Sequence, residues 1–480
     1  MATLATLLWP RAAPLTMALP GWQPAEMFTQ SLTFGIEPQT WPLGFGLCML
    51  NLAVLLTTDK GPTGTGAWAE IGSLAITGFG LLAVVAANPL TLLLIWTAFD
   101  LLELGTMVLA NTDADTGGRA VRAFSWRLLA SGLLLWAGIA SSAPGTETVF
   151  GSLSPGANLL LVLAAAVRLG TAARLGSLSS RATIPSGPRV SLDLTAITAA
   201  AAVLPRVALN PTSGLLPAAL MVSLSIAALA AAWRWLRSGG GASARAHWIL
   251  ACGSLAAFAA LRGAPNAASA WTTALILGGG VLLLNTKRSA TLNRALLLGT
   301  WSISALPFSL TAATWAGVSG IALVLLPAAA VAQGLLMAGY VLHTPRGAGE
   351  EVLDERPAWI RRAYPMGLGG LVIAGMVAGV WGWEGAGVVG GWQVAAGIAA
   401  LSVALVTFHK PLMRWSPATA GVSGRYALYA GRVAAFVQPS FSWLQRVSGA
   451  VTATLEGEGA VMWTLLFLVL LVSLLAGAAP

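Results

Sequence analysis

Charged residues are scarce in this chain. Asp, Glu, Lys and Arg make up 9% of its 480 residues, whereas hydrophobic residues make up 56%. Soluble domains carry about 25% charged residues. The composition therefore excludes an ordinary soluble protein. It predicts a polytopic integral membrane protein of the all-α class, whose core is the transmembrane helix bundle itself.

Cysteine and histidine are also nearly absent. The two cysteines, Cys48 and Cys252, both lie in apolar stretches, and there are three histidines. This excludes a disulfide framework and argues against zinc or haem held by this chain alone. Phosphate-binding glycine motifs, a nucleophile elbow and flavin or nicotinamide fingerprints are lacking too. We therefore expect no cofactor, no metal site and no nucleic-acid partner.

The N-terminus lacks the pattern of a signal peptide. Arg11 and several prolines interrupt its apolar residues, and no long apolar core follows a basic start. We interpret residues 1–39 as a peripheral lead-in, 40–408 as the transmembrane bundle, 409–458 as an amphipathic segment and 459–480 as a terminal anchor.

Long apolar runs dominate the rest of the chain. A bilayer requires about 20 such residues per helix. Fourteen runs meet this length approximately, near residues 40–58, 67–87, 89–111, 120–141, 157–174, 190–208, 213–236, 247–263, 268–286, 293–317, 318–343, 366–384, 390–408 and 460–478.

Basic residues support this count. Lys and Arg gather in cytoplasmic loops of membrane proteins. In this chain they fall in or beside alternate loops, among them Arg127, Arg245 and Lys287, which we assign to the cytoplasmic side. The exceptions are Arg11, Arg168, Arg206 and Arg262. Both termini are then expected on the non-cytoplasmic side, and the net charge of +9 reflects topology rather than an acidic ligand.

Two segments depart from plain helices. The stretch 175–191 is rich in Gly, Ser and Pro, including Pro185, Gly187 and Pro188, which predicts an interrupted helix. The stretch 409–458 is too polar to cross the membrane. Its apolar residues recur at helical spacing, which predicts a helix lying on the cytoplasmic face. The alternative is a simple surface connector.

Three charges fall at membrane depth: Asp100, Glu103 and Arg168. A carboxylate there costs at least about 2.5 kcal/mol on insertion scales, so a function and a partner cation are expected. We predict that Asp100 and Arg168 form a buried pair on adjacent helices, with Glu103 as a secondary partner. Such a pair can act as an electrostatic switch, or it can be a permanent structural ion pair. A further alternative is that the buried carboxyl group stays neutral and is hydrogen-bonded within the bundle.

The histidines are secondary candidates for proton entry. His247, His343 and His409 all fall at the ends of spans on the basic side. An imidazole titrates near neutral pH, which suits proton entry. A purely interfacial role is the alternative.

The order of these elements resembles the antiporter-like membrane subunits of respiratory complex I, which are shared with multisubunit sodium/proton antiporters and membrane-bound hydrogenases. Four stretches carry the resemblance, roughly within residues 30–345: NPLTLLLIWTAFDLLELGTMVLAN, VRLGTAARLGSLSSRATIPSGP, ARAHWILACGSLAAFA and WSISALPFSLTAATW. The resemblance places Asp100 at the family's glutamate and Arg168 at its lysine, and the fourth stretch keeps a proline of the family's motif as Pro307. It implies membrane-subunit partners and proton transport.

This sequence departs from that family at several positions. Arginine replaces the lysine, and the other expected polar residues fall near Ile197, Ala257 and Trp315. Buried ionisable groups after the interrupted helix therefore look almost absent, and we expect the family's hydrophilic axis to be largely erased.

Three functions follow from these observations. The first is a membrane-arm subunit of a complex I-like assembly in the bacterial inner membrane, in which a reduced charge pair retains partial proton translocation or has lost it. The second is a structural scaffold in another membrane complex. The third is an independent ion or solute transporter, because a fold alone does not set a function. The first two imply other membrane subunits and lipids as partners.

Overall fold

The protein is a bundle of long helices with one small hairpin. The computed structural model describes residues 2–19, 31–58, 66–110, 114–142, 148–179, 186–209, 212–238, 241–287, 289–346, 352–381 and 392–408. The α-helices are α1 (Ala2–Ala12), α2 (Trp41–Thr57), α3 (Gly66–Val85), α4 (Pro89–Ala110), α5 (Ala114–Ser141), α6 (Pro155–Ser179), α7 (Ser186–Ala201), α8 (Leu204–Val207), α9 (Leu215–Arg237), α10 (Gly241–Leu261), α11 (Pro265–Leu284), α12 (Ala290–Leu296), α13 (Gly320–His343), α14 (Ala358–Trp381) and α15 (Trp392–Thr407).

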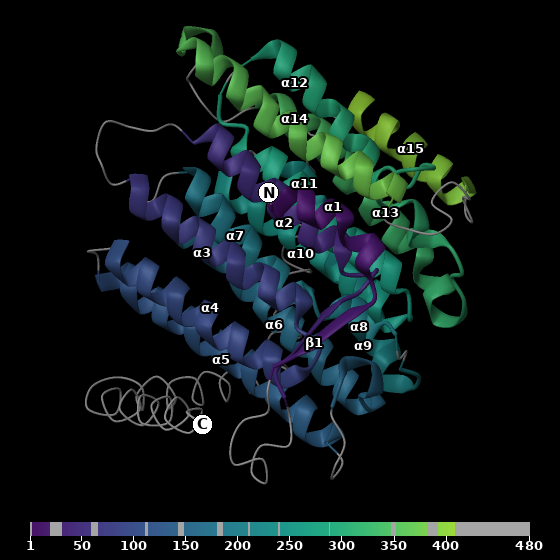
Figure 1. Cartoon of the computed structure of the whole chain (residues 1–480). Coiled ribbons are helices and arrows are strands. Elements are labelled where there is room, and N and C mark those ends of the chain that lie inside the picture. Colours follow the sequence, from purple (N-terminus) through teal and green to yellow (C-terminus); the bar gives the residue numbers. More distant parts are fainter. Residues whose placement is uncertain are drawn as a thin grey trace.

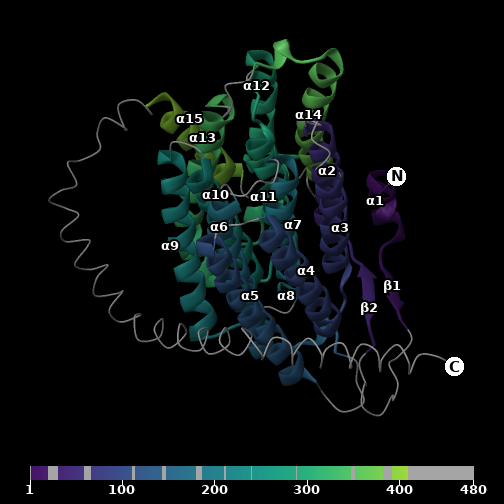
Figure 2. The same cartoon turned by 90° about the vertical axis from the view of Figure 1, so that its left-hand side faces the viewer.

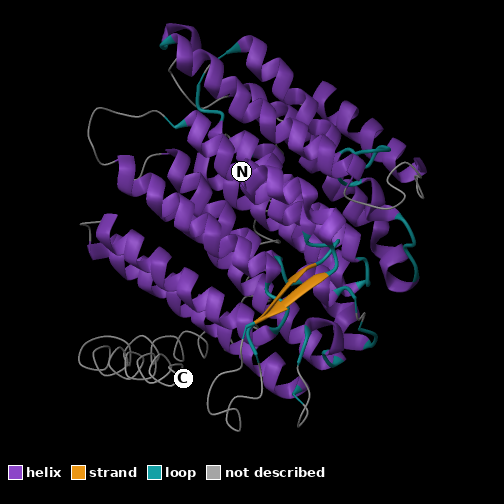
Figure 3. Ribbon diagram, in the orientation of Figure 1, coloured by secondary structure: helices purple, strands orange, loops and turns teal. Residues whose placement is uncertain are grey.

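The remaining elements are short. They are strands β1 (Leu15–Ala18) and β2 (Thr33–Ile36) and the 3-10 helices η1 (Phe150–Ser152), η2 (Leu297–Ile303), η3 (Ala312–Trp315), η4 (Thr344–Arg346) and η5 (Leu353–Glu355). Figure 3 shows how helices dominate the molecule. Within the described residues, eight helices are long and apolar enough to cross a membrane. The predicted all-α membrane bundle is therefore confirmed.

Helix α7 lies at the centre of the bundle. It packs against α2, α3, α6 and α11, while α4 with α5 and α13 with α15 lie toward opposite edges (Figure 1). The apolar window within 187–207 is entirely buried. Alanines crowd its second half, from Ala199 to Ala202, and small side chains let membrane helices approach closely. The tight packing around α7 follows directly from this composition.

The N-terminal lead-in contains structure that the sequence did not suggest. Strands β1 and β2 pair antiparallel, with Leu15 opposite Ile36. The hairpin is tied to the bundle because Ala87 N–H donates to the Thr33 carbonyl at 2.9 Å. Helix α1 packs on α2, where Trp41 Nε1 donates to the Thr6 carbonyl at 2.5 Å. Figure 2 places the hairpin at the end of the bundle opposite α12.

Three of the connections that carry basic residues, those after α9, α11 and α13, meet at one end of the bundle. The connection after α9 meets the end of α13, where Ser238 Oγ lies 3.4 Å from His343 Nε2. The connection after α11 meets the same region, because Asn285 Nδ2 donates to the Thr344 carbonyl at 3.0 Å. Helices α9, α11 and α13 therefore end on the same side of the bundle. We call this end the basic-loop end.

The predicted tenth span, near 293–317, is wrong as a continuous helix. The segment forms α12, then η2, then an irregular turn with positive φ at Ala305 and Phe308, then η3. Irregular backbone is tolerated inside a membrane bundle where neighbouring side chains bind its polar groups. Here Gln333 Nε2 donates a hydrogen bond to the Ile303 carbonyl at 2.9 Å. Helix α14 approaches the turn through Gly379, where a Cβ atom would clash with the Phe308 carbonyl.

The predicted interruption after α6 is partly confirmed. Helix α6 ends at Ser179 and α7 begins at Ser186, so the helix is not continuous. Gly187 and Pro188, however, lie in the first turn of α7, so their placement in the break was wrong. A proline is tolerated there because a backbone N–H in the first turn has no partner within the helix. Pro185, His409, the segment 409–458 and the predicted last span lie outside the described residues.

Candidate functional site

Asp100 and Arg168 form a buried ion pair between two helices of the bundle. Asp100 lies on α4 and Arg168 on α6, and each is 3% exposed. Arg168 Nη1 donates to Asp100 Oδ2 at 2.9 Å, and Nη2 donates to Oδ1 at 2.5 Å. This two-nitrogen geometry is the strongest arrangement available to a guanidinium and a carboxylate. The structure thus brings together the two residues that the sequence singled out.

The guanidinium of Arg168 is held from its other sides as well. Its Cζ lies 4.2 Å from the centre of the Trp96 ring, and Nη1 also reaches Ser131 Oγ at 3.3 Å. A cation over an aromatic face contributes about 2 kcal/mol when both are desolvated. Trp96 is fixed in turn, because its Nε1 donates to the Ala199 carbonyl of α7 at 2.9 Å. The central helix therefore helps to position the ion pair.

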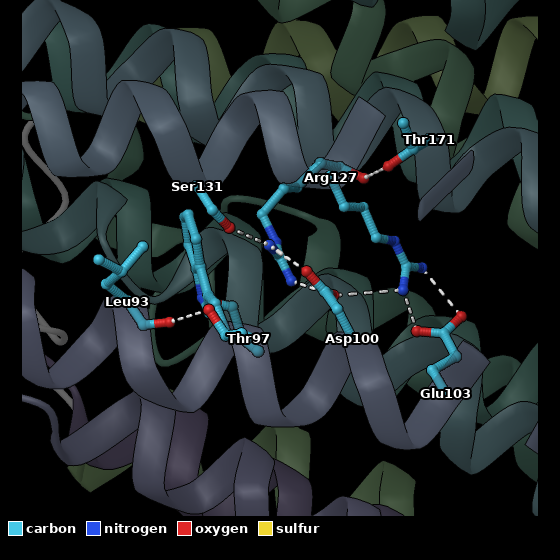
Figure 4. A network of polar contacts seen from close by, with 10 residues as sticks. Leu93, Thr97, Asp100, Glu103, Arg127, Ser131 and Thr171 are labelled. Carbon is cyan, nitrogen blue, oxygen red and sulfur yellow. Dashed lines mark hydrogen bonds and ion pairs between the residues drawn. The ribbon is translucent and has the colours of Figure 1, made fainter. Parts of the chain in front are cut away.

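Glu103 binds a different arginine. Both guanidinium nitrogens of Arg127 contact its carboxylate, with Nη2 donating to Oε1 at 2.9 Å. Arg127 Nη1 also lies 3.5 Å from Asp100 Oδ1. The two ion pairs are therefore one network of four charges, shown in Figure 4, and we call Asp100, Glu103, Arg127 and Arg168 the central network. Glu103, expected as a secondary partner of the Asp100–Arg168 pair, is joined to that pair through Arg127.

Arg127, which the charge pattern counted with the basic residues beside a loop, belongs to the interior of the bundle. It lies well inside α5 and is 4% exposed. Sequence spacing contained the signal, because Arg127 and Ser131 are four residues apart and therefore share one helical face. Asp100 and Glu103 are three apart and share a face of α4 in the same way. Helix α5 packs on both α4 and α6, so its polar face completes the network between them.

The central network is electrically balanced. Two carboxylates face two guanidiniums, and all four side chains are no more than 5% exposed. An isolated ion at this depth would cost several kcal/mol, whereas a paired and hydrogen-bonded ion recovers much of that cost. Arginine stays protonated at any ordinary pH. The carboxylates of Asp100 and Glu103 are therefore the groups in this network that can gain or lose a proton.

Further buried ion pairs lie after the interrupted helix. Asp193 on α7 pairs with Arg245 on α10, and Arg206 on α8 binds Glu37 through Nε at 3.1 Å. Asp193 is 4% exposed and Arg206 is fully buried. The prediction that buried ionisable groups almost vanish in this region was wrong. Lys287, also assigned to a loop, is buried beside the Tyr364 ring at 5.3 Å.

The positions where the resemblance implies missing polar groups are apolar, as the sequence shows. Ile197 and Ala257 are buried in the core. Trp315 is buried too, and its Nε1 donates to Gln333 Oε1 at 2.7 Å. A polar cluster around Gln333, on the neighbouring α13, therefore stands beside Trp315 and the irregular turn.

Two of the three candidate histidines are described. His343 is buried, its Nε2 lies 2.9 Å from the Trp235 carbonyl, and its ring lies 4.2 Å from the Trp235 ring. His343, at the end of α13, therefore caps a backbone carbonyl in the last turn of α9. His247 is half-buried in α10. Both cysteines are free and buried, and the described residues contain no group of His, Cys, Asp and Glu that could hold a metal ion.

Comparison of the sequence with protein-family models and with curated proteins finds no match. Solved structures do share the fold. A chain of the Mrp complex from Dietzia sp. DQ12-45-1b matches all of this chain with a TM-score of 0.68 and 17% identity. This chain spans 60% of the length of that one.

Two respiratory complexes show the same fold. A chain of respiratory complex I from Thermus thermophilus, with bound aureothin, has a TM-score of 0.53 and 18% identity over 79% of this chain and 90% of its own. A chain of the membrane-bound sulfane sulfur reductase, an archaeal respiratory membrane complex, has a TM-score of 0.61 and 10% identity. This match covers 98% of the present chain and 94% of the reductase chain. The resemblance to antiporter-like membrane subunits is therefore confirmed at the level of the fold, and this is an integral membrane protein of that architecture.

Proposed function

We propose that this chain is an antiporter-like membrane subunit of a multi-subunit complex and that protons pass through its central network. The observation that supports this most strongly is the Asp100–Arg168 ion pair, which lies at the positions where the resemblance places the family's glutamate and lysine. An ionisable residue at membrane depth marks an ion pathway by default, because its insertion is costly.

In this mechanism the carboxylates carry the proton and the arginines control them. Each guanidinium favours the charged form of the carboxylate it binds, so a carboxyl group accepts a proton when its arginine moves away. Asp100 lies between Arg168 and Arg127, and either arginine can therefore hold it. Lysine could also surrender its own proton, and its replacement by arginine confines the transfer to Asp100 and Glu103.

The second candidate is a scaffold that no longer moves protons. The observation that favours it is the two-nitrogen binding of both carboxylates, which suits a permanent strut. The buried Asp193–Arg245 pair favours translocation instead, because a scaffold needs no further charges in its core.

Partners and location follow from the same proposal. The solved structures that share the fold are chains of the Mrp complex and of two respiratory complexes, so we propose that other integral membrane subunits and lipids surround this chain. We place it in the bacterial cytoplasmic membrane, with the basic-loop end in the cytoplasm and both termini outside. Isolation in mild detergent, followed by identification of the chains that co-purify, tests the membership of a complex.

Proton movement tests the function directly. The purified assembly is reconstituted in vesicles with either the natural chain or the double variant Asp100→Asn with Arg168→Gln, and proton flux is followed with a pH-sensitive dye. The double variant removes both charges together and strands neither, so it should assemble normally and lose flux. Unchanged flux in the double variant would establish the scaffold instead.

A further inference from the structure

The Asp193–Arg245 pair occupies a distinct place in the bundle. Asp193 lies in the second turn of α7 and Arg245 near the start of α10, and both helices begin at the basic-loop end. The Asp193 side chain is 3% exposed, whereas that of Arg245 is 12% exposed. The carboxylate is therefore enclosed by the bundle, while its partner reaches toward the loops.

Arg245 holds its carboxylate less completely than the arginines of the central network do. It contacts Asp193 through Nη1, and its buried Nε has no hydrogen-bond partner among the described residues. Arg168 and Arg127 each bind a carboxylate through two nitrogens. A single contact to a partly exposed arginine is easier to release, because water can hydrate the guanidinium that leaves.

Asp193 also links the central network to the basic-loop end. Arg189 lies one turn before it on the same helix, and Arg245 on α10 contacts it directly. Helix α7 also packs on α4 and α6, which carry the carboxylates and Arg168 of the central network. Leu192, the neighbour of Asp193 on α7, belongs to the same buried apolar cluster as Phe99, the neighbour of Asp100 on α4. Asp193 is therefore a carboxylate that lies between the basic-loop end and the helices of the central network.

We propose that Asp193 is the proton-accepting group between the basic-loop end and the central network, and that Arg245 controls it by binding or releasing the carboxylate. This inference rests on the proposed function. A hydronium ion at the basic-loop end gives its proton to Asp193 and becomes water. The Asp193 acid then gives the proton, through water, to the Glu103 carboxylate. Both arginines stay protonated, and nothing is oxidised or reduced.

Proton flux provides the first test, in the reconstituted assembly. Asp193→Asn should lower flux by about tenfold or more, because the amide cannot take up a proton at this step. Asp193→Glu keeps a carboxyl group and should restore most of the flux. Glu37→Gln is the matched control, since it removes a carboxylate from an ion pair at the opposite end. Full flux in Asp193→Asn would overturn the inference.

A one-sided titration provides the second test, and it does not require the chain to pump. In Arg245→Gln the infrared band of the protonated carboxyl should follow a pH step applied at the basic-loop side of sealed vesicles. The band belongs to Asp193 if adding Asp193→Asn removes it. A response only to the opposite side, or to neither side, would overturn the inference. Absent flux in the natural chain with a one-sided titration intact would instead reject the proposed function alone.

Discussion

Arg127 Nη1 lies 3.5 Å from Asp100 Oδ1, and this contact joins two ion pairs into one network. Without this contact there would be two independent ion pairs, one formed by Asp100 with Arg168 and the other by Glu103 with Arg127. With it, a change in one pair alters the field at the other, because buried charges are weakly screened. Coupling between the pairs is therefore the property to measure first.

A double-mutant cycle measures this coupling. Glu103→Gln and Arg168→Gln are expected to change the free energy of unfolding non-additively, by about 0.5–3 kcal/mol, because both residues belong to one charge network. Denaturant titration of the purified protein in detergent gives the energies. The control cycle pairs Arg168→Gln with Glu37→Gln, which lies in another ion pair, and should be additive within about 0.5 kcal/mol. Additivity in both cycles would show that the network does not act as a unit.

Removing one charge should cost more than removing two. Asp100→Leu strands Arg168 at membrane depth and should destabilise the protein by about 3–5 kcal/mol, whereas Asp100→Leu with Arg168→Met should be nearly neutral. Thermal unfolding of the two variants in the same detergent makes the comparison. Leu101→Ala is the control, since the neighbouring Leu101 is 49% exposed on the outer face of α4. A double variant less stable than the single one would contradict this account.

Gln333 should stabilise the irregular turn after η2. Gln333→Leu leaves the Ile303 carbonyl and the Trp315 indole N–H without their partner, and a buried polar group left unpaired costs about 1–3 kcal/mol. Unfolding in detergent should show the loss, and tryptophan fluorescence should shift as Trp315 moves. Val331→Ala, on an exposed part of the same helix, provides the comparison. A stable Gln333→Leu variant would mean that the turn holds without side-chain support.

Cysteine labelling tests the orientation in the membrane. Single cysteines at Ser180 and Gly239, in the connections after α6 and α9, should react with an impermeant reagent from the cytoplasmic side. A cysteine at Ser213, which is exposed before α9, should react from the other side. The two natural cysteines are buried and should remain silent. Labelling of all three positions from one side would refute the alternating arrangement.

The sequence by itself determined the class of protein and much of its plan. Composition required a helical membrane bundle, because so apolar a chain cannot stay dissolved. Charge alternation grouped the connections after α9, α11 and α13, which do meet at one end. The rarity of carboxylates within apolar runs singled out Asp100 and Glu103, and the same reasoning selected Arg168 as the partner of Asp100. These properties are local, so they can be recognised along a linear sequence.

Only the tertiary structure decided how the remaining charges are paired. Arg127 and Arg245 look like loop residues in the sequence, because both lie close to polar stretches, yet each reaches a carboxylate on another helix. Asp193 passes unnoticed for the same reason, and the irregular turn depends on Gln333 from α13. Long arginine side chains bridge helices that are distant in sequence. Whether such a charge faces water or a buried partner is therefore set by which helices pack together, and no local pattern records that choice.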